Sequence, residues 1–239
     1  MRRSTALAGA LAAGATILLT GPAAQAAATD VIYVPDDFVT ALSDTRATGS
    51  FGLEGTGLRI TTTGSTSTDK VAEYVATDVS LADADEPELD YANTSGGGVP
   101  GFQLVVDFDG RDGRDGILVG EAVYDGDWWL SNSAAPFVKD GAPVTGGGSG
   151  SAWHGTLDEW RAEFPDAEVL AFGFSLGSGV KGDGVIEAIE FADTRYTFAR
   201  HVQFTAKQQC KDGGWATSTK PVFRNQGECV ASLARSGGR

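Results

Sequence analysis

The chain has 239 residues, with 32 acidic against 18 basic side chains and a formal charge of -14. A hydrophobic content of 41%, including 12 Phe and 5 Trp, is enough for a packed core, so the composition excludes a wholly disordered chain. The acidic balance argues against a nucleic-acid partner, because a protein that holds phosphates needs a cationic face.

The first 26 residues have the pattern of a secretory signal peptide. Arg2 and Arg3 precede an apolar stretch over 6–20, and a small-residue triplet follows at 24–26. The stretch is too short and too rich in alanine for a membrane span, and no second one follows, so we expect no transmembrane segment after signal cleavage. We expect cleavage after Ala26 and a secreted, extracellular protein. General secretion is the expected route, and the paired arginines leave twin-arginine export as the alternative.

Charge is distributed unevenly along the rest of the chain. Residues 27–195 carry 30 acidic and 9 basic side chains, whereas residues 196–239 carry 2 acidic and 7 basic ones. A composition break of this size marks a boundary. The sequence therefore predicts an acidic domain over 27–199 and a basic C-terminal tail over 200–239.

Short apolar runs separated by Gly, Asp, Ser and Thr predict antiparallel β structure throughout the acidic domain. Alternation is cleanest at 102–108 and 168–177. The other expected strands are 51–62, 70–79, 117–124, 128–132 and 185–198, the last broken near Asp193. One helix is expected after Thr156, where a capping box with Glu159 begins an apolar stripe that Pro165 ends.

The turn at 107–116 reads D-F-D-G-R-D-G-R-D-G. Carboxylates in a Gly-rich turn suit calcium, which takes about six to eight oxygen ligands from a tightly folded backbone. The turn resembles the Asp-rich calcium loops of secreted bacterial proteins, although Arg111 stands at the third ligand position. The resemblance implies calcium as a cofactor, held by Asp107, Asp109, Asp112 and Asp115. The alternative is a plain hairpin whose arginines offset the acids.

Two adjacent tryptophans, Trp128 and Trp129, face opposite sides of a strand. The outward one would offer a surface for stacking a sugar ring, and Trp153 would add a second ring. The alternative places these rings under loops or the helix, which is commoner for tryptophan. The candidate ligand-binding residues are Asp127, Trp128, Trp129, Asn132 and Trp153.

Catalytic signatures are weak. The G-x-S-x-G pattern at 173–177 matches the nucleophile elbow of serine hydrolases, but strand alternation runs through Ser175 and no helix can follow it. A glycosidase needs two facing carboxylates, and the acids available for this role are Glu121, Asp127, Glu159 and Glu187. The sequence has neither a zinc-binding pair of His or Cys nor a nucleotide-binding motif, so no catalytic residue is assigned.

The number and spacing of the expected strands, with one short helix, predict an all-β, jelly-roll-like antiparallel β-sandwich. The stretch at 173–198 resembles the final strands of extracellular galactose-binding-like and lectin-like jelly rolls. That fold-level resemblance implies glycan binding.

The tail holds the only cysteines, Cys210 and Cys229, which we expect to pair in an exported chain. The loop they close would be a small hairpin with Trp215 and Phe223 as its core. The letters C-K-D-G-G-W at 210–215 and F-R-N-Q-G-E-C-V at 223–230 resemble a C-terminal two-cysteine motif of secreted proteins from high-GC Gram-positive bacteria. The resemblance implies a lineage and a compartment. By charge, the tail would dock on the acidic domain or reach anionic wall polymers.

These features predict a secreted or cell-wall-associated, non-enzymatic protein that binds carbohydrate or another surface ligand, with a polysaccharide or cell-wall polymer as its partner. One alternative is a glycan-active hydrolase that uses acids such as Glu121 and Asp127. Another is a purely structural or adhesive surface protein. A carboxylate pair across an aromatic-lined cleft would favour the enzyme, and a flat face with one exposed Trp would favour the binding protein.

Overall fold

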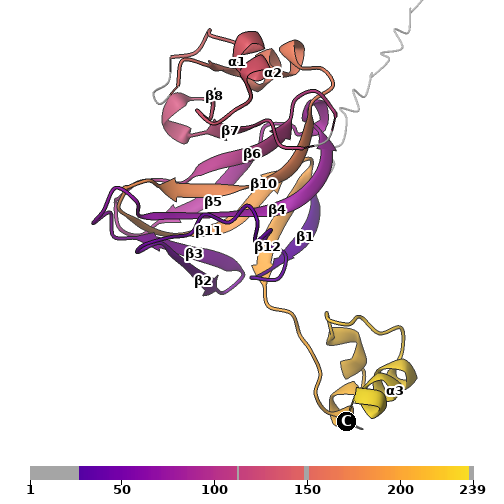
Figure 1. Cartoon of the computed structure of the whole chain (residues 1–239). Helices are drawn as coiled ribbons and strands as arrows, with labels where there is room; N and C mark the ends of the chain where they lie inside the picture. Colours follow the sequence, from indigo (N-terminus) through magenta and orange to yellow (C-terminus); the bar gives the residue numbers. More distant parts are fainter. Residues whose placement is uncertain (1–26, 112, 148–150, 237–239) are drawn as a thin grey trace, which may run out of the picture.

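The computed structural model describes residues 27–111, 113–147 and 151–236 (Figure 1). The expected signal peptide and Asp112, one of the four calcium candidates, lie outside the described residues. The strands are β1 (Ala28–Tyr33), β2 (Ser50–Glu54), β3 (Gly57–Thr62), β4 (Lys70–Ser80), β5 (Glu88–Asn93), β6 (Gly101–Asp107), β7 (Gly116–Gly120), β8 (Asp127–Leu130), β9 (His154–Thr156), β10 (Glu168–Gly177), β11 (Gly182–Phe191) and β12 (Thr194–Ala199). The α-helices are α1 (Pro136–Gly141), α2 (Leu157–Glu163) and α3 (Gln226–Ser236).

Two six-stranded sheets enclose the core (Figure 1). The first has the order β1-β12-β11-β3-β2, and β5 also pairs with β11. Its strands pair antiparallel except β1, which runs parallel to β12. The second has the order β4-β10-β6-β7-β8-β9 and is antiparallel throughout. The predicted all-β sandwich is confirmed.

Several element boundaries differ from the prediction. The run expected at 51–62 is a hairpin of β2 and β3, because Gly55 adopts a positive φ of 63° and turns the chain back. The predicted break near Asp193 does separate β11 from β12, and Asp193 also has a positive φ. Strands β1, β5 and β9 and helix α1 were not predicted. These elements are short or lack clean alternation. The three strands form by pairing with strands that are distant in sequence.

The clean alternation at 102–108 and 168–177 places one face of β6 and β10 in the core. Phe102, Leu104, Phe172 and Phe174 are all buried there. Ser175 is buried on the opposite face of β10, directly between Ala72 and Gly101. Because β10 continues straight through this position, the G-x-S-x-G match is a strand with small residues on one face, as expected, and not a nucleophile elbow.

Helix α2 forms as predicted and covers one end of the second sheet (Figure 1). Thr156 caps it, and the reciprocal bonds of the capping box with Glu159 are both present. Leu157 and Trp160 are fully buried, and the indole Nε1 of Trp160 donates to the Trp128 carbonyl at 3.1 Å. The helix is therefore fixed to β8 both by packing and by a buried hydrogen bond.

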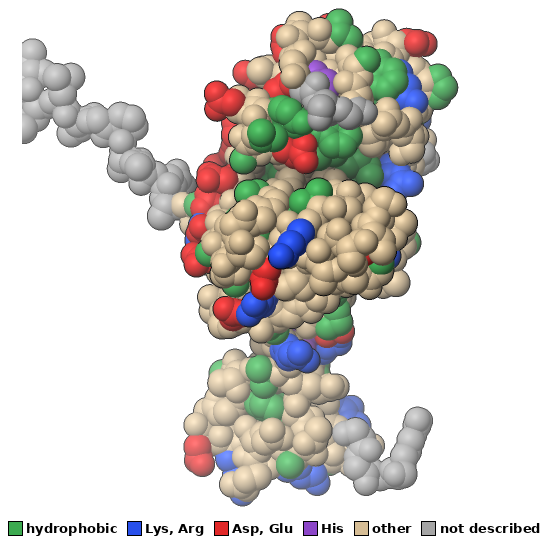
Figure 2. Space-filling model, turned by 90° about the vertical axis from the view of Figure 1, so that its left-hand side faces the viewer, with side chains coloured by type: hydrophobic (Ala, Val, Ile, Leu, Met, Phe, Trp, Pro, Cys, Tyr) green, Lys and Arg blue, Asp and Glu red, His purple; other side chains and the backbone are tan. Residues whose placement is uncertain are grey.

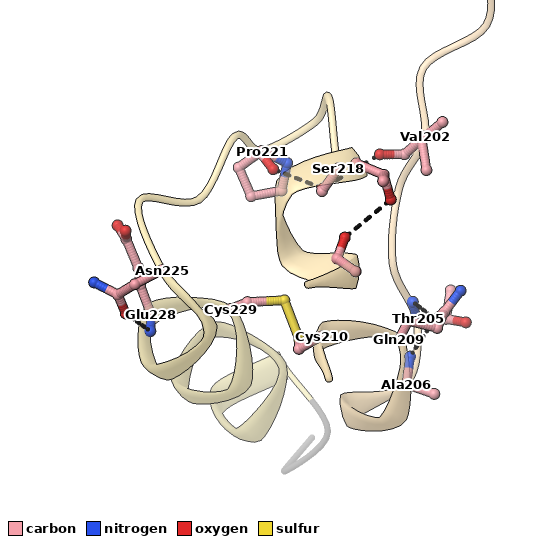
Figure 3. The surroundings of a disulfide bond; sticks show 12 residues. Val202, Thr205, Ala206, Gln209, Cys210, Ser218, Pro221, Asn225, Glu228 and Cys229 are labelled. Carbon is pink, nitrogen blue, oxygen red and sulfur yellow. Dashed lines mark hydrogen bonds between the residues drawn. A yellow bond between two sulfur atoms is a disulfide. The ribbon is translucent and has the colours of Figure 1, made fainter. Parts of the chain in front are cut away.

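The C-terminal tail folds around the expected disulfide between Cys210 and Cys229, whose Cα atoms lie 5.8 Å apart (Figure 3). The expected hairpin is wrong. The described part of the tail contains two short 3-10 helices, Lys207–Cys210 and Gly214–Thr217, and helix α3. The Asn225 side chain accepts from the Glu228 N–H at 2.9 Å and so caps α3, a local signal that favours a helix over a strand.

The core of this tail is small. Phe204, Cys210, Phe223 and Cys229 are buried, whereas Trp215 is only partly buried and packs at its edge. With so few buried side chains, the covalent link is the main constraint on the fold, and closing a loop of this length contributes about 3 kcal/mol.

The tail contacts the sandwich near the end of β1. The His201 ring stacks on Tyr33 with centroids 4.0 Å apart, and the Lys220 ammonium lies 3.4 Å from the Asp36 carboxylate. Figure 2 shows acidic side chains spread over the sandwich and few on the tail. These contacts correspond to the docking alternative, and binding of wall polymers by the tail stays a prediction.

Candidate functional site

The site lies where β7, β8 and β9 form one edge of the second sheet. Val119, Trp129 and His154 stand directly opposite one another across these strands, so their side chains share the face that points away from the first sheet. Trp128 faces the other way and is 3% exposed in the core. The register thus decides which tryptophan faces outward, a point that the sequence left open.

Asp127 and His154 meet diagonally across β8 and β9. Asp127 is paired with Thr156, so His154 lies two positions away on the same face and within reach of its carboxylate. The imidazole Nδ1 lies 2.9 Å from Oδ2 of Asp127, and the His154 side chain is only 3% exposed. This pair is the main buried polar contact of the site.

Two buried atoms of this pair have no hydrogen-bond partner among the described residues, Oδ1 of Asp127 and Nε2 of His154. An ionised carboxylate can only accept, so Nδ1 carries the proton of the Asp127–His154 bond. Of the two unpartnered atoms, Oδ1 of Asp127 therefore requires a hydrogen-bond donor.

An open hollow of about 500 Å³ lies beside this pair and is lined by Asp127 but not by His154. The short 3-10 helix Ala122–Tyr124, strands β8 and β9, the first turn of α2 and the loop after α1 surround it. Its lining residues are Val123, Tyr124, Asp125, Asp127, Thr145, Gly146, Gly147, Thr156 and Glu159. The lining combines one aromatic ring with hydroxyl groups and three carboxylates.

Glu159 is held in place at the rim of the hollow. Its Oε2 accepts from the Thr145 hydroxyl at 2.7 Å and from the Thr156 backbone N–H at 2.9 Å. These bonds, that from Thr145 first, lower the pKa of Glu159 below its ordinary value. Glu159 therefore acts as an ionised acceptor, which is the opposite of what a general acid must be.

Gly146 packs directly on the Asp127 carboxylate. A Cβ at this position would lie 2.1 Å from Oδ1, so only glycine allows the loop to approach so closely. The backbone N–H groups of Thr145 and Gly146 both donate to the His154 carbonyl, at 3.0 and 3.1 Å. The loop is thus bonded to β9 beside the buried pair.

Of the predicted ligand-binding residues, Asp127 alone lines this hollow. Trp129 is partly exposed on the same sheet face, and its Nε1 donates to Glu121 at 3.2 Å. Trp153 is partly buried against the core beneath the Lys139 ammonium, 5.1 Å from the ring centre. Asn132 is exposed beyond the end of β8. The structure therefore does not gather the five residues into one platform.

The acids of the hydrolase alternative have different hydrogen-bond partners and lie in different places. Glu121 and Asp127 border a second hollow of about 220 Å³, but each accepts a hydrogen bond, from Trp129 and from His154 respectively. Glu187 is exposed on β11, in the other sheet.

The predicted calcium turn brings three carboxylates together. Oxygens of Asp107, Asp109 and Asp115 all lie within 4.8 Å of one another. The same carboxylates also accept from the turn's own backbone: Gly110 N–H to Asp107 at 2.8 Å, and Phe108 N–H to Asp115 at 2.9 Å. These bonds close the hairpin without an ion, so the calcium and hairpin alternatives both stand.

Sequence reasoning missed the role of His154. The notable residue at this point in the sequence was its neighbour Trp153, because an isolated histidine gives no pattern. The only available signal was that Asp127 and Trp129 share a strand face, and the partner strand β9 is three residues long.

Comparison with protein-family models, with curated proteins and with solved structures found no match. Within the described residues, no helix is both long enough and apolar enough to cross a bilayer.

Proposed function

We propose that this is a secreted, non-enzymatic protein that binds carbohydrate in the hollow beside Asp127. The observation that carries the proposal is the lining of that hollow, in which the Tyr124 ring lies among the hydroxyls of Thr145 and Thr156 and the carboxylates of Asp127 and Glu159. Sugars present ring faces to aromatic side chains and hydroxyl groups to such acceptors. The shallow, open shape suits a chain-like glycan.

Two features support a secreted protein. The signal-like segment at 1–26 predicts export, and the disulfide is a bond that persists in oxidising compartments. Retention at the cell wall is a further part of the proposal, and it rests on the charge of the tail.

The hollow favours binding over hydrolysis. Its best-held acid, Glu159, is an ionised acceptor with a lowered pKa, whereas glycoside cleavage needs a protonated acid beside the scissile bond. Asp127 is likewise engaged as an acceptor for His154. The lowered pKa of Glu159 therefore supports a role for this carboxylate in recognition and not as a general acid.

The test is depletion of the exported protein from solution by insoluble glycans and isolated Gram-positive walls. We expect retention on at least one glycan and a loss of about threefold to tenfold in affinity for Tyr124→Ala, because a ring contact is removed. Phe137→Ala is the matched control, since this ring is 41% exposed on α1 and does not line the hollow. Absence of retention on every glycan would contradict the proposal and favour the structural or adhesive alternative.

A further inference from the structure

A pocket of about 130 Å³, which we call the N-terminal pocket, lies at the start of β1 beside the turn that joins β11 to β12. Ala27, one residue before β1, lines it. Four acidic residues line it too, and these are Asp85, Glu86, Glu190 and Asp193. No residue lines both this pocket and the hollow beside Asp127, so the two are separate places.

Two of the four acids already have a cationic partner. Glu86 pairs with Arg161 at 3.4 Å, and Glu190 pairs with Arg195. Each of these glutamates therefore has a counter-charge within the described part of the chain.

Asp85 and Asp193 differ from the two glutamates. None of the ion pairs between described residues involves either carboxylate, and Arg161 reaches Asp85 only at its backbone carbonyl. The two side chains instead share a hydrogen bond, and this bond and the charge of Asp85 raise the pKa of Asp193 above its ordinary value. A cation beside two such carboxyl groups would favour the ionised form of both.

The sheet places the expected start of the mature chain against this pair. Ala28 pairs with Thr194 in the parallel ladder of β1 and β12, and its N–H donates to the Asp193 carbonyl at 3.0 Å. Ala27, one residue earlier, therefore lies beside Asp193. On independent grounds, the small-residue triplet at 24–26 predicts signal cleavage after Ala26, which would make Ala27 the first residue of the exported chain.

We propose that the α-ammonium group of Ala27, released by signal cleavage, is the counter-cation of Asp85 and Asp193 and fixes β1 at the edge of the first sheet. Hydrolysis of the bond between Ala26 and Ala27 consumes one water, and leaves a carboxylate on the released segment and an ammonium on the chain that remains. Before cleavage the same nitrogen is an uncharged amide, so the two aspartates lack this counter-charge. The inference rests on the export part of the proposed function and not on carbohydrate binding.

The experiment is N-terminal sequencing of the exported protein, followed by a pH titration of the NMR signal of the Ala27 methyl group. We expect the chain to start at Ala27. We also expect the pKa of its α-ammonium to lie above the ordinary value of about 8, because nearby carboxylates favour the charged form. A start at another residue would overturn the inference, and so would an α-ammonium pKa at or below the ordinary value.

Three variants separate the specific contact from the general field of an acidic protein. Asp85→Asn and Asp193→Asn each remove one charge from the pocket and are expected to lower the α-ammonium pKa toward its ordinary value. Both residues have a positive φ, 51° and 57°, which asparagine also adopts, so the turns are retained. Glu187→Gln removes the same charge from an exposed position on β11 outside the pocket, and is expected to leave the value unchanged. Equal lowering in all three variants would overturn the inference.

Thermal unfolding gives a second readout of the same contact. Acetylation of the α-amine removes its charge, and near pH 7 should lower the unfolding temperature by about 1–3 °C, the range for an exposed ion pair in a chain of this size. Because pairing raises the folded pKa of the ammonium, its contribution is present at neutral pH and is lost as pH rises through that pKa. The difference should therefore close above about pH 9, and also below about pH 4, where the carboxylates are protonated. A difference that is the same at every pH would contradict the ion pair.

Failure of the inference and failure of the proposed function give different results. A chain that is exported and starts at Ala27, but has an ordinary α-ammonium pKa, contradicts the inference and leaves secretion and carbohydrate binding standing. An exported chain that still carries residues 1–26 contradicts the inference and the predicted signal cleavage together.

Discussion

Two acidic regions of this protein differ in how their carboxylates are satisfied. In the turn at 107–115, Asp107 accepts from the N–H groups of Asp109 and Gly110, and Asp115 accepts from that of Phe108. In the hollow, Oδ1 of Asp127 has no donor among the described residues. The turn is the denser in acids, yet its backbone already supplies hydrogen-bond donors.

The difference teaches that carboxylate density alone does not mark a binding site. A dense run of Asp and Gly also arises where a chain turns sharply, because Asp accepts from its own backbone. An acceptor that the fold leaves without a donor is more informative, because burying it costs stability unless a ligand or water completes it.

The largest expected effect tests the structural role of the turn. Asp115→Ala should destabilise the protein by about 1–3 kcal/mol, because it leaves the N–H of buried Phe108 without an acceptor. Asp127→Asn should change the free energy of unfolding by less than about 1 kcal/mol, because the amide oxygen still accepts from His154. Urea unfolding of both variants measures the difference, and the reverse order would break the comparison.

The next effect concerns α2, the helix whose first turn lines the hollow. Thr156→Ala removes the N-cap of α2 and one anchor of Glu159, and should cost about 1 kcal/mol and weaken glycan retention. Thr29→Ala, at an exposed position on β1, is the control and should stay within about 0.5 kcal/mol of the wild type. Loss of stability with unchanged retention would show that Glu159 does not contribute to binding.

A smaller effect appears in the pH dependence of stability. Because the folded pKa of Glu159 is lowered, its contribution is present above the unfolded value of about 4.3 and is lost as pH falls through the folded pKa. The stability gap between the wild type and Glu159→Gln should be constant above about pH 5 and close below about pH 4. Adding Thr145→Ala to both proteins should narrow the gap, since the Thr145 hydroxyl is the main cause of the shift. Thermal unfolding across pH measures this, and a gap that widens in acid would contradict the sign.

The smallest effect decides between the alternatives for the turn. Calcium binding would raise the unfolding temperature relative to chelator, by an increment that grows with the ratio of calcium concentration to Kd. The plain hairpin predicts equal unfolding temperatures. Asp109→Asn is the informative variant, because Asp109 lies within the carboxylate group and its contacts with described residues are with the exposed Arg111, through its N–H and its guanidinium at 3.6 Å. A calcium-dependent shift that this variant abolishes would turn the hairpin into a metal site.

The sequence by itself determined the elements whose signals are local. Period-two alternation predicted β6 and β10, the Thr156–Glu159 capping box predicted α2, and the two cysteines predicted their own bond. These signals suffice because strand faces and helix caps depend on residues only a few positions apart. The tail shows the limit of this reasoning, since the disulfide was predicted but the helices around it were not.

Only the tertiary structure decided the candidate site. Pairing of β8 with β9 brings Asp127 beside His154, 27 residues later in the chain, and the same register sends Trp128 inward. A one-residue change of register would exchange the two faces and bury a different tryptophan. Residue types and spacing do not record strand register across a long loop, so the contact between Asp127 and His154 becomes visible only once the sheet is assembled.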